Sequence, residues 1–268
     1  IFGGYNVYSD PGSTSYEKLP RGLRRGIMHI AESLPAHRGV NFFVRKGKDL
    51  EERFIGNAYM FTPKDRKALL KIQTNAPDPM AITKPYYDQV KDQDDVTKMQ
   101  YLDLHLWMAG DILLKADKMS MANSLELRVP FLDKEVMALA QRIPTRYRVI
   151  HKPSESGGTP YITKYAMRLA AKKDTPPQTA KTAAKKKLGF PVPIRVWLKE
   201  DTYYNMVKNT FEGNAAQQFF HTEKLVQLLD DHRAGKADNS RKIWTVYMFL
   251  VWYHVYFESD VIPTKPNV

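Results

Sequence analysis

Apolar residues recur every three or four positions along much of the chain, which is the spacing of an amphipathic helix. The clearest case is 17–34, where five leucine and isoleucine side chains fall on one face. Arg21, Arg24 and Arg25 lie off that stripe, so we expect them on the solvent side of the helix. The same analysis predicts helices over 39–56, 63–73, 94–108, 111–123, 133–143, 160–173, 201–212, 222–234 and 241–257.

Capping and breaking residues predict where these helices begin and end. Thr62 and Thr159 are each followed by a proline, which is typical of a helix start. Gly110 is expected to separate the 94–108 helix from the 111–123 helix. The cap residues expected from the sequence are Thr62, Asp133, Thr159 and Thr222.

Segments without helical spacing are predicted to be loops. Residues 1–14 are rich in Gly, Ser and Pro, 74–93 contains three prolines, and 146–160 is polar with a glycine pair. Residues 172–187 are dominated by Lys, Ala, Thr and Pro. We therefore expect 174–187 to be a basic linker.

One predicted helix carries a carboxylate on its apolar face. Asp117 falls in one narrow stripe with the apolar residues four positions before and after it. An ionised Asp is costly to bury unless it is paired, so we expect a structural ion pair or cap, with ligand binding as the alternative. Beyond this helix, 125–129 alternates with period two and places Glu126 and Arg128 on the same side as a pair of structural charges.

Composition is typical of a globular protein, with 268 residues of which 43% are hydrophobic and 26% charged. The chain has no cysteine, which excludes disulfides, cysteine-based zinc sites and a cysteine nucleophile within it. The apolar 241–257 helix has fewer apolar residues than a membrane span needs, so we expect a core helix. The net charge of +12 indicates either solvated basic faces or an anionic partner.

Four stretches carry a resemblance to a known family. The run Leu-Leu-Lys-Ala-Asp-Lys-Met-Ser-Met-Ala-Asn-Ser-Leu-Glu-Leu-Arg-Val-Pro-Phe-Leu-Asp (113–133) resembles the signature of the synthetase domain of glutamine-hydrolysing asparagine synthetases. Ile-Thr-Lys-Tyr-Ala-Met-Arg-Leu-Ala (162–170) and Lys-Lys-Leu-Gly-Phe-Pro-Val-Pro-Ile-Arg-Val-Trp (186–197) are similar to two further segments of that family. Phe-Gly-Gly-Tyr (2–5) resembles a fourth, and the four come in the family's order.

The resemblance implies a particular place in a larger fold. The family's synthetase domain is an α/β domain of the adenine-nucleotide-α-hydrolase-like (PP-loop ATPase) type, with a parallel sheet that binds ATP. The chain starts at Ile1 in what reads as structured sequence, so we expect a fragment: the C-terminal, mainly α portion of that domain, with its sheet mostly missing. Its parts would be a loop over 1–14, a helical core over 15–173, the linker, and C-terminal helices over 188–268.

The resemblance also implies a chemistry and its partners. In the family, glutamine supplies ammonia, and ATP activates the aspartate side chain as an adenylate, from which asparagine, AMP and pyrophosphate form. ATP and Mg²⁺ would be bound mainly by the absent N-terminal part, and the other partners would be aspartate, ammonia or glutamine, and the remainder of the same polypeptide. We expect a cytoplasmic protein that binds neither nucleic acid nor membrane. Helices built to cover a missing sheet would expose apolar surface, which favours association, including a homodimer.

Four residues become candidates through their positions in the matching segments. Lys164, which is implied to face pyrophosphate and the reaction centre, is the catalytic candidate, since a lysine in the first turn of a helix adds charge to an anion-binding position. Lys187 is implied to reach phosphate. Arg168 lies one turn after Lys164 and would make a structural ion pair or touch the ligand, and Asp117 matches an acidic position of the family. No histidine spacing indicates a metal site.

The departures from the family limit what this chain can do alone. It lacks the Ser-Gly-Gly-x-Asp-Ser phosphate loop, the Ser-Gly-Glu-Gly-Ala-Asp-Glu stretch and a glutaminase domain, so we expect the 268-residue chain by itself to be inactive. Two alternatives stay open. One is another amide-forming member of the family, of the β-lactam or peptide-cyclising type. The other is a basic helical nucleic-acid-binding module, which rests on net charge and the 172–187 lysines only.

Overall fold

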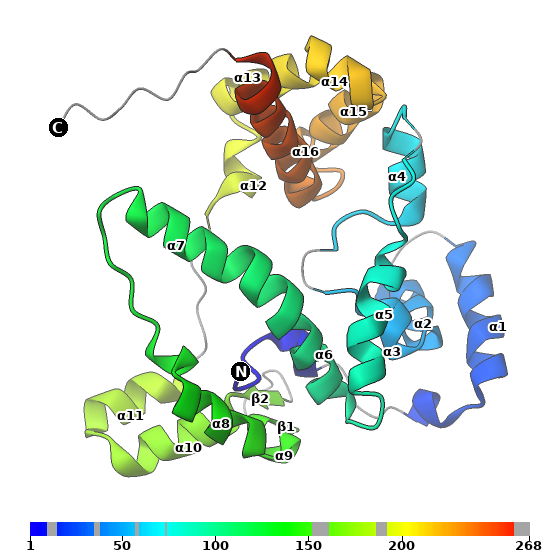
Figure 1. Cartoon of the computed structure of the whole chain (residues 1–268). Helices are drawn as coiled ribbons and strands as arrows, with labels where there is room; N and C mark the ends of the chain where they lie inside the picture. The colour runs from blue at the N-terminus through cyan, green and yellow to red at the C-terminus, as the bar shows by residue number, and fades with distance from the viewer. Residues whose placement is uncertain are drawn as a thin grey trace. The chain divides into compact units, whose positions relative to one another are not determined.

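The computed structural model describes residues 1–9, 15–34, 38–56, 59–72, 74–151, 161–185 and 192–259 (Figure 1). The chain divides into two compact units. The first comprises Ile1–Ala58 and Pro77–Lys187, and the second comprises Tyr59–Ala76 and Leu188–Val268. Helices dominate both units, which confirms the prediction of a mainly α fold.

The first unit holds fourteen helical segments of the described chain and one strand pair. In chain order its elements are η1 (Asn6–Ser9), η2 (Ser15–Lys18), α1 (Arg21–Glu32), α2 (Arg38–Gly47), α3 (Leu50–Arg53), α5 (Pro79–Gln89), α6 (Asp95–Asp103), η3 (Leu104–Leu113), α7 (Leu114–Met121), η4 (Pro130–Leu132), α8 (Lys134–Arg142), α9 (Thr145–Arg148), β1 (Val149–His151), β2 (Tyr161–Thr163), α10 (Tyr165–Asp174) and α11 (Pro177–Ala184).

A single long helix runs through the first unit, where the sequence predicted two. The elements α6, η3 and α7 follow one another without a break and form one rod (Figure 1). Gly110 does not separate them, because it lies within η3, a π-helical stretch whose wider turns continue the helix. The Asp94 carboxylate accepts from the Thr97 amide at 3.1 Å and caps the start of this rod.

The predicted loop over 74–93 is wrong, because it contains α5. Asp78 caps this helix and Pro79 occupies its first position, while Pro85 lies inside it. An interior proline removes one helical hydrogen bond, but tertiary packing offsets that loss here. Tyr87 is buried and its hydroxyl donates to the Phe54 carbonyl at 2.6 Å.

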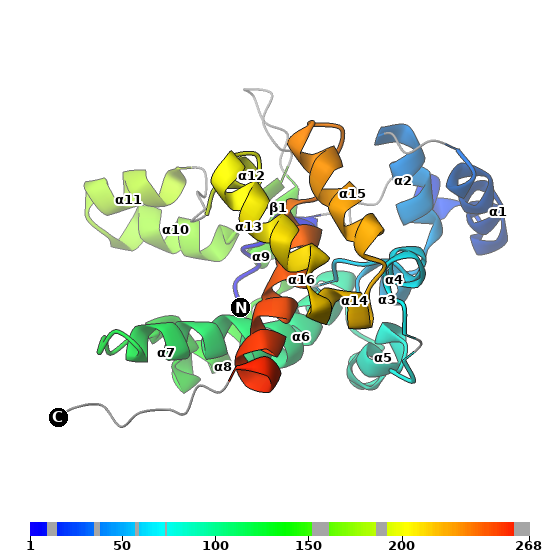
Figure 2. The same cartoon turned by 90° about the horizontal axis from the view of Figure 1, so that it is seen from above.

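The segments around 150 and 180 also differ from the prediction. The antiparallel pair β1–β2 aligns Ile150 with Ile162, where 146–151 was expected to be loop and 161–163 to be helix. The residues of both strands include the β-branched types that favour a pleated surface. The expected linker contains α11, which Pro177 opens and alanines extend. It lies beside α10 (Figures 1 and 2).

The packed face of α1 includes part of the face predicted to be wet. Arg24 donates to the Lys46 carbonyl at 3.0 Å, and Arg25 pairs with Glu52 at 2.6 Å. These two arginines are partly buried beside the buried Met28, whereas Arg21 is exposed as predicted. The apolar side chains of the predicted stripe that stay exposed are Leu23, Ile30 and Leu34.

The 39–56 region is two helices rather than one. The Asp49 backbone N–H donates to the Glu52 carboxylate at 2.9 Å, which starts α3 after α2 has ended at Gly47.

The core of the first unit lies near the end of α3 and joins this region to α5 and α6. Its buried members are Tyr8, Phe54, Tyr87, Val96, Met99 and Leu102.

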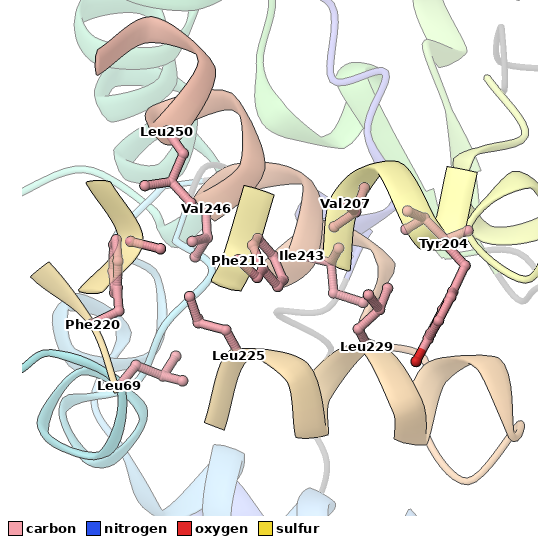
Figure 3. Close-up of a cluster of buried hydrophobic side chains, with 12 residues drawn as sticks. Leu69, Tyr204, Val207, Phe211, Phe220, Leu225, Leu229, Ile243, Val246 and Leu250 are labelled. Carbon is pink, nitrogen blue, oxygen red and sulfur yellow. The ribbon is translucent and has the colours of Figure 1, made fainter. Parts of the chain in front are cut away.

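All the named elements in the described part of the second unit are helices, and an isolated β-bridge links Leu70 to Phe220. The elements are α4 (Pro63–Leu69), α12 (Ile194–Trp197), α13 (Asp201–Glu212), α14 (Asn214–Phe219), α15 (Thr222–Arg233), α16 (Ser240–Tyr253) and η5 (His254–Glu258). Side chains from α4, α13, α15 and α16 meet in one buried cluster (Figure 3). Phe211, Leu225 and Leu229 are fully buried at its centre.

One face of the apolar helix α16 packs in the core of the second unit. Ile243, Val246 and Leu250 are buried, whereas Trp244 and Trp252 are more than 40% exposed. Within the residues that the structure describes, no helix is both long enough and apolar enough to cross a membrane.

Candidate functional site

The N-terminal segment of the first unit packs against the backbone and side chains around β1 and Lys164. Gly3 adopts φ +67°, and a Cβ there would come within 2.9 Å of Val149. A Cβ on Gly4 would come within 2.7 Å of Lys164 Cε. The two glycines therefore allow a positive φ at Gly3 and a close approach of the Lys164 side chain to the backbone at Gly4.

Lys164 lies between β2 and α10 rather than inside a helix. Its φ of +55° is left-handed, which is uncommon for a residue with a side chain. It occupies the N-cap position of α10, so the expectation that it stands in the first helical turn is wrong by one position. The reason is that 161–163 pair with β1, which postpones the helix to Tyr165.

A cavity of about 220 Å³ opens beside Lys164. Segments far apart in the sequence build it: the N-terminal residues, η3, η4 and the start of α10. Phe2 and Phe131 meet edge to face at 6.3 Å between ring centroids. The lining residues are Ile1, Phe2, Gly4, Tyr5, Tyr8, Met108, Phe131, Leu132, Lys164 and Met167.

The buried carboxylate of Asp103 lies next to Tyr8, which lines this cavity. Tyr8 donates its hydroxyl to Asp103, and both side chains are buried. Burial, reinforced by the Asp103 charge, raises the pKa of Tyr8 above its ordinary value, so the phenol stays protonated. Burial followed by the charges of Asp103 and Asp111 also raises the pKa of Tyr5.

Sequence reasoning missed Asp103, although the signal it used for Asp117 was present. Asp103 lies one turn after Met99, on the stripe that faces the core, and it is 5% exposed. Asp117 lies on a similar stripe of α7 but is exposed, so the prediction that it is buried is wrong. In the described parts of the chain no hydrogen-bond or ion-pair partner reaches its carboxylate.

The surroundings of Asp117 explain the difference. All residues from Met121 to Phe131 are exposed, so the stripe that Asp117 shares is not covered by any described part of this chain. The predicted charge pair does form, since Arg128 and Glu126 lie 2.5 Å apart, but both are solvent-exposed. The role of Asp117 in ligand binding stays a prediction.

Polar side chains hold the N-terminal segment in place. Arg148 donates to Gln100 at 2.9 Å, and Gln100 donates to the Ile1 carbonyl at 3.1 Å. Arg148 also donates to the Ile143 carbonyl at 2.7 Å. Burial lowers the pKa of the Arg148 guanidinium, which nevertheless stays charged at neutral pH. Nothing in the local sequence pattern indicated this network.

Arg168 contacts backbone rather than a carboxylate. Its guanidinium donates to the carbonyls of Thr163, Ala183 and Lys185. The structural ion pair considered from the sequence is thus replaced by hydrogen bonds that join α10 to the end of α11. Lys187 lies outside the described residues, so its contact with phosphate stays a prediction.

The described residues offer an anion partner but no metal centre. Lys164 brings an ammonium group to an apolar and aromatic cavity, where a charge interacts more strongly than in water. Within the described residues no three His, Asp or Glu side chains gather where they could hold a metal ion.

The sequence is similar to one family model and to several curated proteins. The family model described as asparagine synthase matches residues 1–254. Asparagine synthetase [glutamine-hydrolyzing] 1 of Bacillus subtilis is 43% identical over 267 residues, which is 99% of this chain and 40% of the relative. A putative asparagine synthetase [glutamine-hydrolyzing] of Mycobacterium bovis is 38% identical over 265 residues, 98% of this chain and 39% of the relative.

The extent of these matches decides the family. The chain spans about two fifths of the length of these curated relatives. No solved structure matches it. Because the family model covers nearly the whole chain and the relatives match it almost from end to end, the chain belongs to the asparagine synthase family.

Proposed function

We propose that this chain is the C-terminal part of the synthetase domain of a glutamine-hydrolysing asparagine synthetase. In the whole protein it would take part in the ATP-dependent conversion of aspartate to asparagine. The family membership and the names of the relatives support this activity. The structural observation that supports the site is the position of Lys164, which has a left-handed backbone and lines the aromatic cavity.

The proposed reaction has two steps. An oxygen of the aspartate side-chain carboxylate attacks the α-phosphorus of ATP, and pyrophosphate leaves with the bonding electron pair, which gives β-aspartyl-AMP. Ammonia derived from glutamine then attacks the acyl carbon, a proton is lost from nitrogen, and AMP leaves with asparagine as product. Lys164 stabilises the negative charge that develops on the departing pyrophosphate.

The remaining assignments follow the family resemblance. Lys187 would contact phosphate, and Asp117 would act in the same site once the missing part of the polypeptide covers the exposed 121–131 surface. ATP and Mg²⁺ would be held mainly by that missing part. The proposal also includes a cytoplasmic location and a homodimer, for which the exposed apolar side chains provide a surface.

The test is a kinetic comparison in the full-length polypeptide that contains this chain. We expect Lys164→Ala to lower aspartate-dependent pyrophosphate release by about 100-fold, as loss of one electrostatic contact to a transition state does. Lys172→Ala is the matched control, because Lys172 lies on the same helix and is exposed. Equal rates for the two variants would refute the role of Lys164.

Two further arms separate the alternatives. The purified 268-residue chain should release no pyrophosphate above its own Lys164→Ala variant, and activity there would contradict the proposed dependence on a missing part. Pyrophosphate release from the full-length protein that does not depend on aspartate would indicate a different carboxylate substrate.

A further inference from the structure

The Arg168 side chain bonds to backbone carbonyls at two places, one just before Lys164 and one at the end of α11. Its Nε atom donates to the Thr163 carbonyl at 3.0 Å, and its Nη1 atom donates to the carbonyls of Ala183 and Lys185. Thr163 immediately precedes Lys164, and Ala183 and Lys185 lie at the end of α11. We propose that Arg168 is a positioning residue, which holds the backbone next to Lys164 against the end of α11 and acts on the reaction through Lys164.

The first anchor is the peptide that links Thr163 to Lys164. Lys164 sits in a left-handed conformation, which is unfavourable for a residue with a side chain and persists only when neighbouring contacts hold it. No side-chain cap bond supports the start of α10. The Arg168 side chain supplies that support through Nε, in addition to the ordinary helical bond from its backbone N–H to the Lys164 carbonyl at 3.0 Å.

The second anchor is the C-terminal end of α11. The last carbonyls of a helix lack partners within it and carry partial negative charge, so a guanidinium is a suitable cap. By bonding to Ala183 and Lys185, Arg168 fixes the end of α11 next to the start of α10. The helices α10 and α11 lie side by side, which makes this short connection feasible (Figure 2).

The shape of the guanidinium group explains why arginine is needed at position 168. A guanidinium presents several N–H donors in a rigid plane and can bond to carbonyls in different directions at once, whereas a lysine ammonium is a compact charge on a flexible stem. Arg168→Lys should therefore fail to hold both anchors, although it keeps the positive charge.

The catalytic test is a double-mutant cycle in the full-length polypeptide, and it rests on the proposed function of Lys164. We expect Arg168→Ala to lower kcat by about 10- to 100-fold, since a displacement of about 1 Å can have that effect. If Arg168 acts through Lys164, adding Arg168→Ala to Lys164→Ala should lower kcat by less than about threefold more. A loss in the double variant equal to the product of the two single losses would overturn the inference.

Hydrogen exchange provides a readout that does not depend on activity. In the full-length protein, Arg168→Ala should accelerate amide exchange both at 163–168 and at 182–185, whereas the Lys172→Ala control should not. Unchanged exchange at either place would overturn the inference. If Lys164→Ala proves fully active, the proposed role of Lys164 falls, and the exchange result alone decides whether Arg168 holds both segments.

Discussion

The side chain of Lys164 occupies the space that a Cβ on Gly4 would need, with Cε 2.7 Å from that position. Gly4→Ala should therefore displace the lysine without straining the backbone, because the clashing atom is near the end of a flexible side chain. In the full-length protein we expect kcat to fall about tenfold or more, with a change in unfolding free energy below about 1 kcal/mol.

The control for this variant is Gly22→Ala. Gly22 lies in α1, and a Cβ there would have nothing within 4 Å. Alanine in a helix should then stabilise the protein by about 0.5–1 kcal/mol and leave the rate unchanged. A Gly4→Ala enzyme with full kcat would show that the position of Lys164 does not limit the reaction.

Thr62 and Thr222 provide a matched pair of predicted helix caps. The Thr62 hydroxyl accepts from the Asp65 amide at 3.1 Å, and the Thr62 backbone N–H donates to the Asp65 carboxylate. Thr222 makes no cap bond, because His221 occupies the cap position of α15. In urea unfolding we expect Thr62→Ala to cost about 1 kcal/mol and Thr222→Ala less than half of that. Equal losses would contradict the capping geometry.

Asp94 should make stability depend on pH in the acidic range. Burial opposes its ionisation, but hydrogen bonds from Thr145 and Thr97 and the charge of Arg148 outweigh it, so the pKa of Asp94 is lowered. A carboxyl whose pKa is lower in the folded state stabilises the protein above the unfolded pKa, and this contribution is lost as pH falls through the folded pKa. We expect unfolding free energy to decrease between about pH 5 and about pH 2.

The measurement is the same pH series on Asp94→Asn. An asparagine still accepts the cap bond from the Thr97 amide but carries no titrating charge. The variant should lose part of the acid dependence and retain α6. A pH profile identical to that of the unaltered protein would exclude a contribution from Asp94.

Phe211 should be critical to the second unit. It is 0% exposed, at the centre of the cluster that α13, α15 and α16 form (Figure 3). Phe211→Ala removes buried apolar surface and leaves a cavity, so we expect a loss of about 3–5 kcal/mol in urea unfolding. The exposed Asn209 on the same helix serves as control, and Asn209→Ala should change stability by less than about 0.5 kcal/mol.

Local signals predicted part of the fold well. Thr62 and Asp133 cap helices as expected. These features depend on neighbours within a few residues. The helix α5 was missed because its prolines argued against it, and only the packing of Tyr87 on Phe54 shows why it forms.

The candidate site was harder to predict. Lys164 was found through the family resemblance, yet its place before α10 depends on pairing between β1 and β2. Arg168 was considered for an ion pair or ligand contact. Its carbonyl partners at the end of α11 lie 15 and 17 residues further along, so no local pattern indicated them. Whether Lys164, Lys187 and Asp117 contact substrate stays a prediction.

The sequence by itself determined the family, the mainly α character and the helix starts that short-range caps specify. Which faces are covered depends on tertiary contacts: Arg24 and Arg25 of α1 are partly covered by the 46–52 segment, and Asp103 is buried while Asp117 is exposed. The physical reason is that periodicity shows that a face is apolar but not what packs on it. Burial and hydrogen bonding depend on partners that the fold brings together from distant parts of the chain.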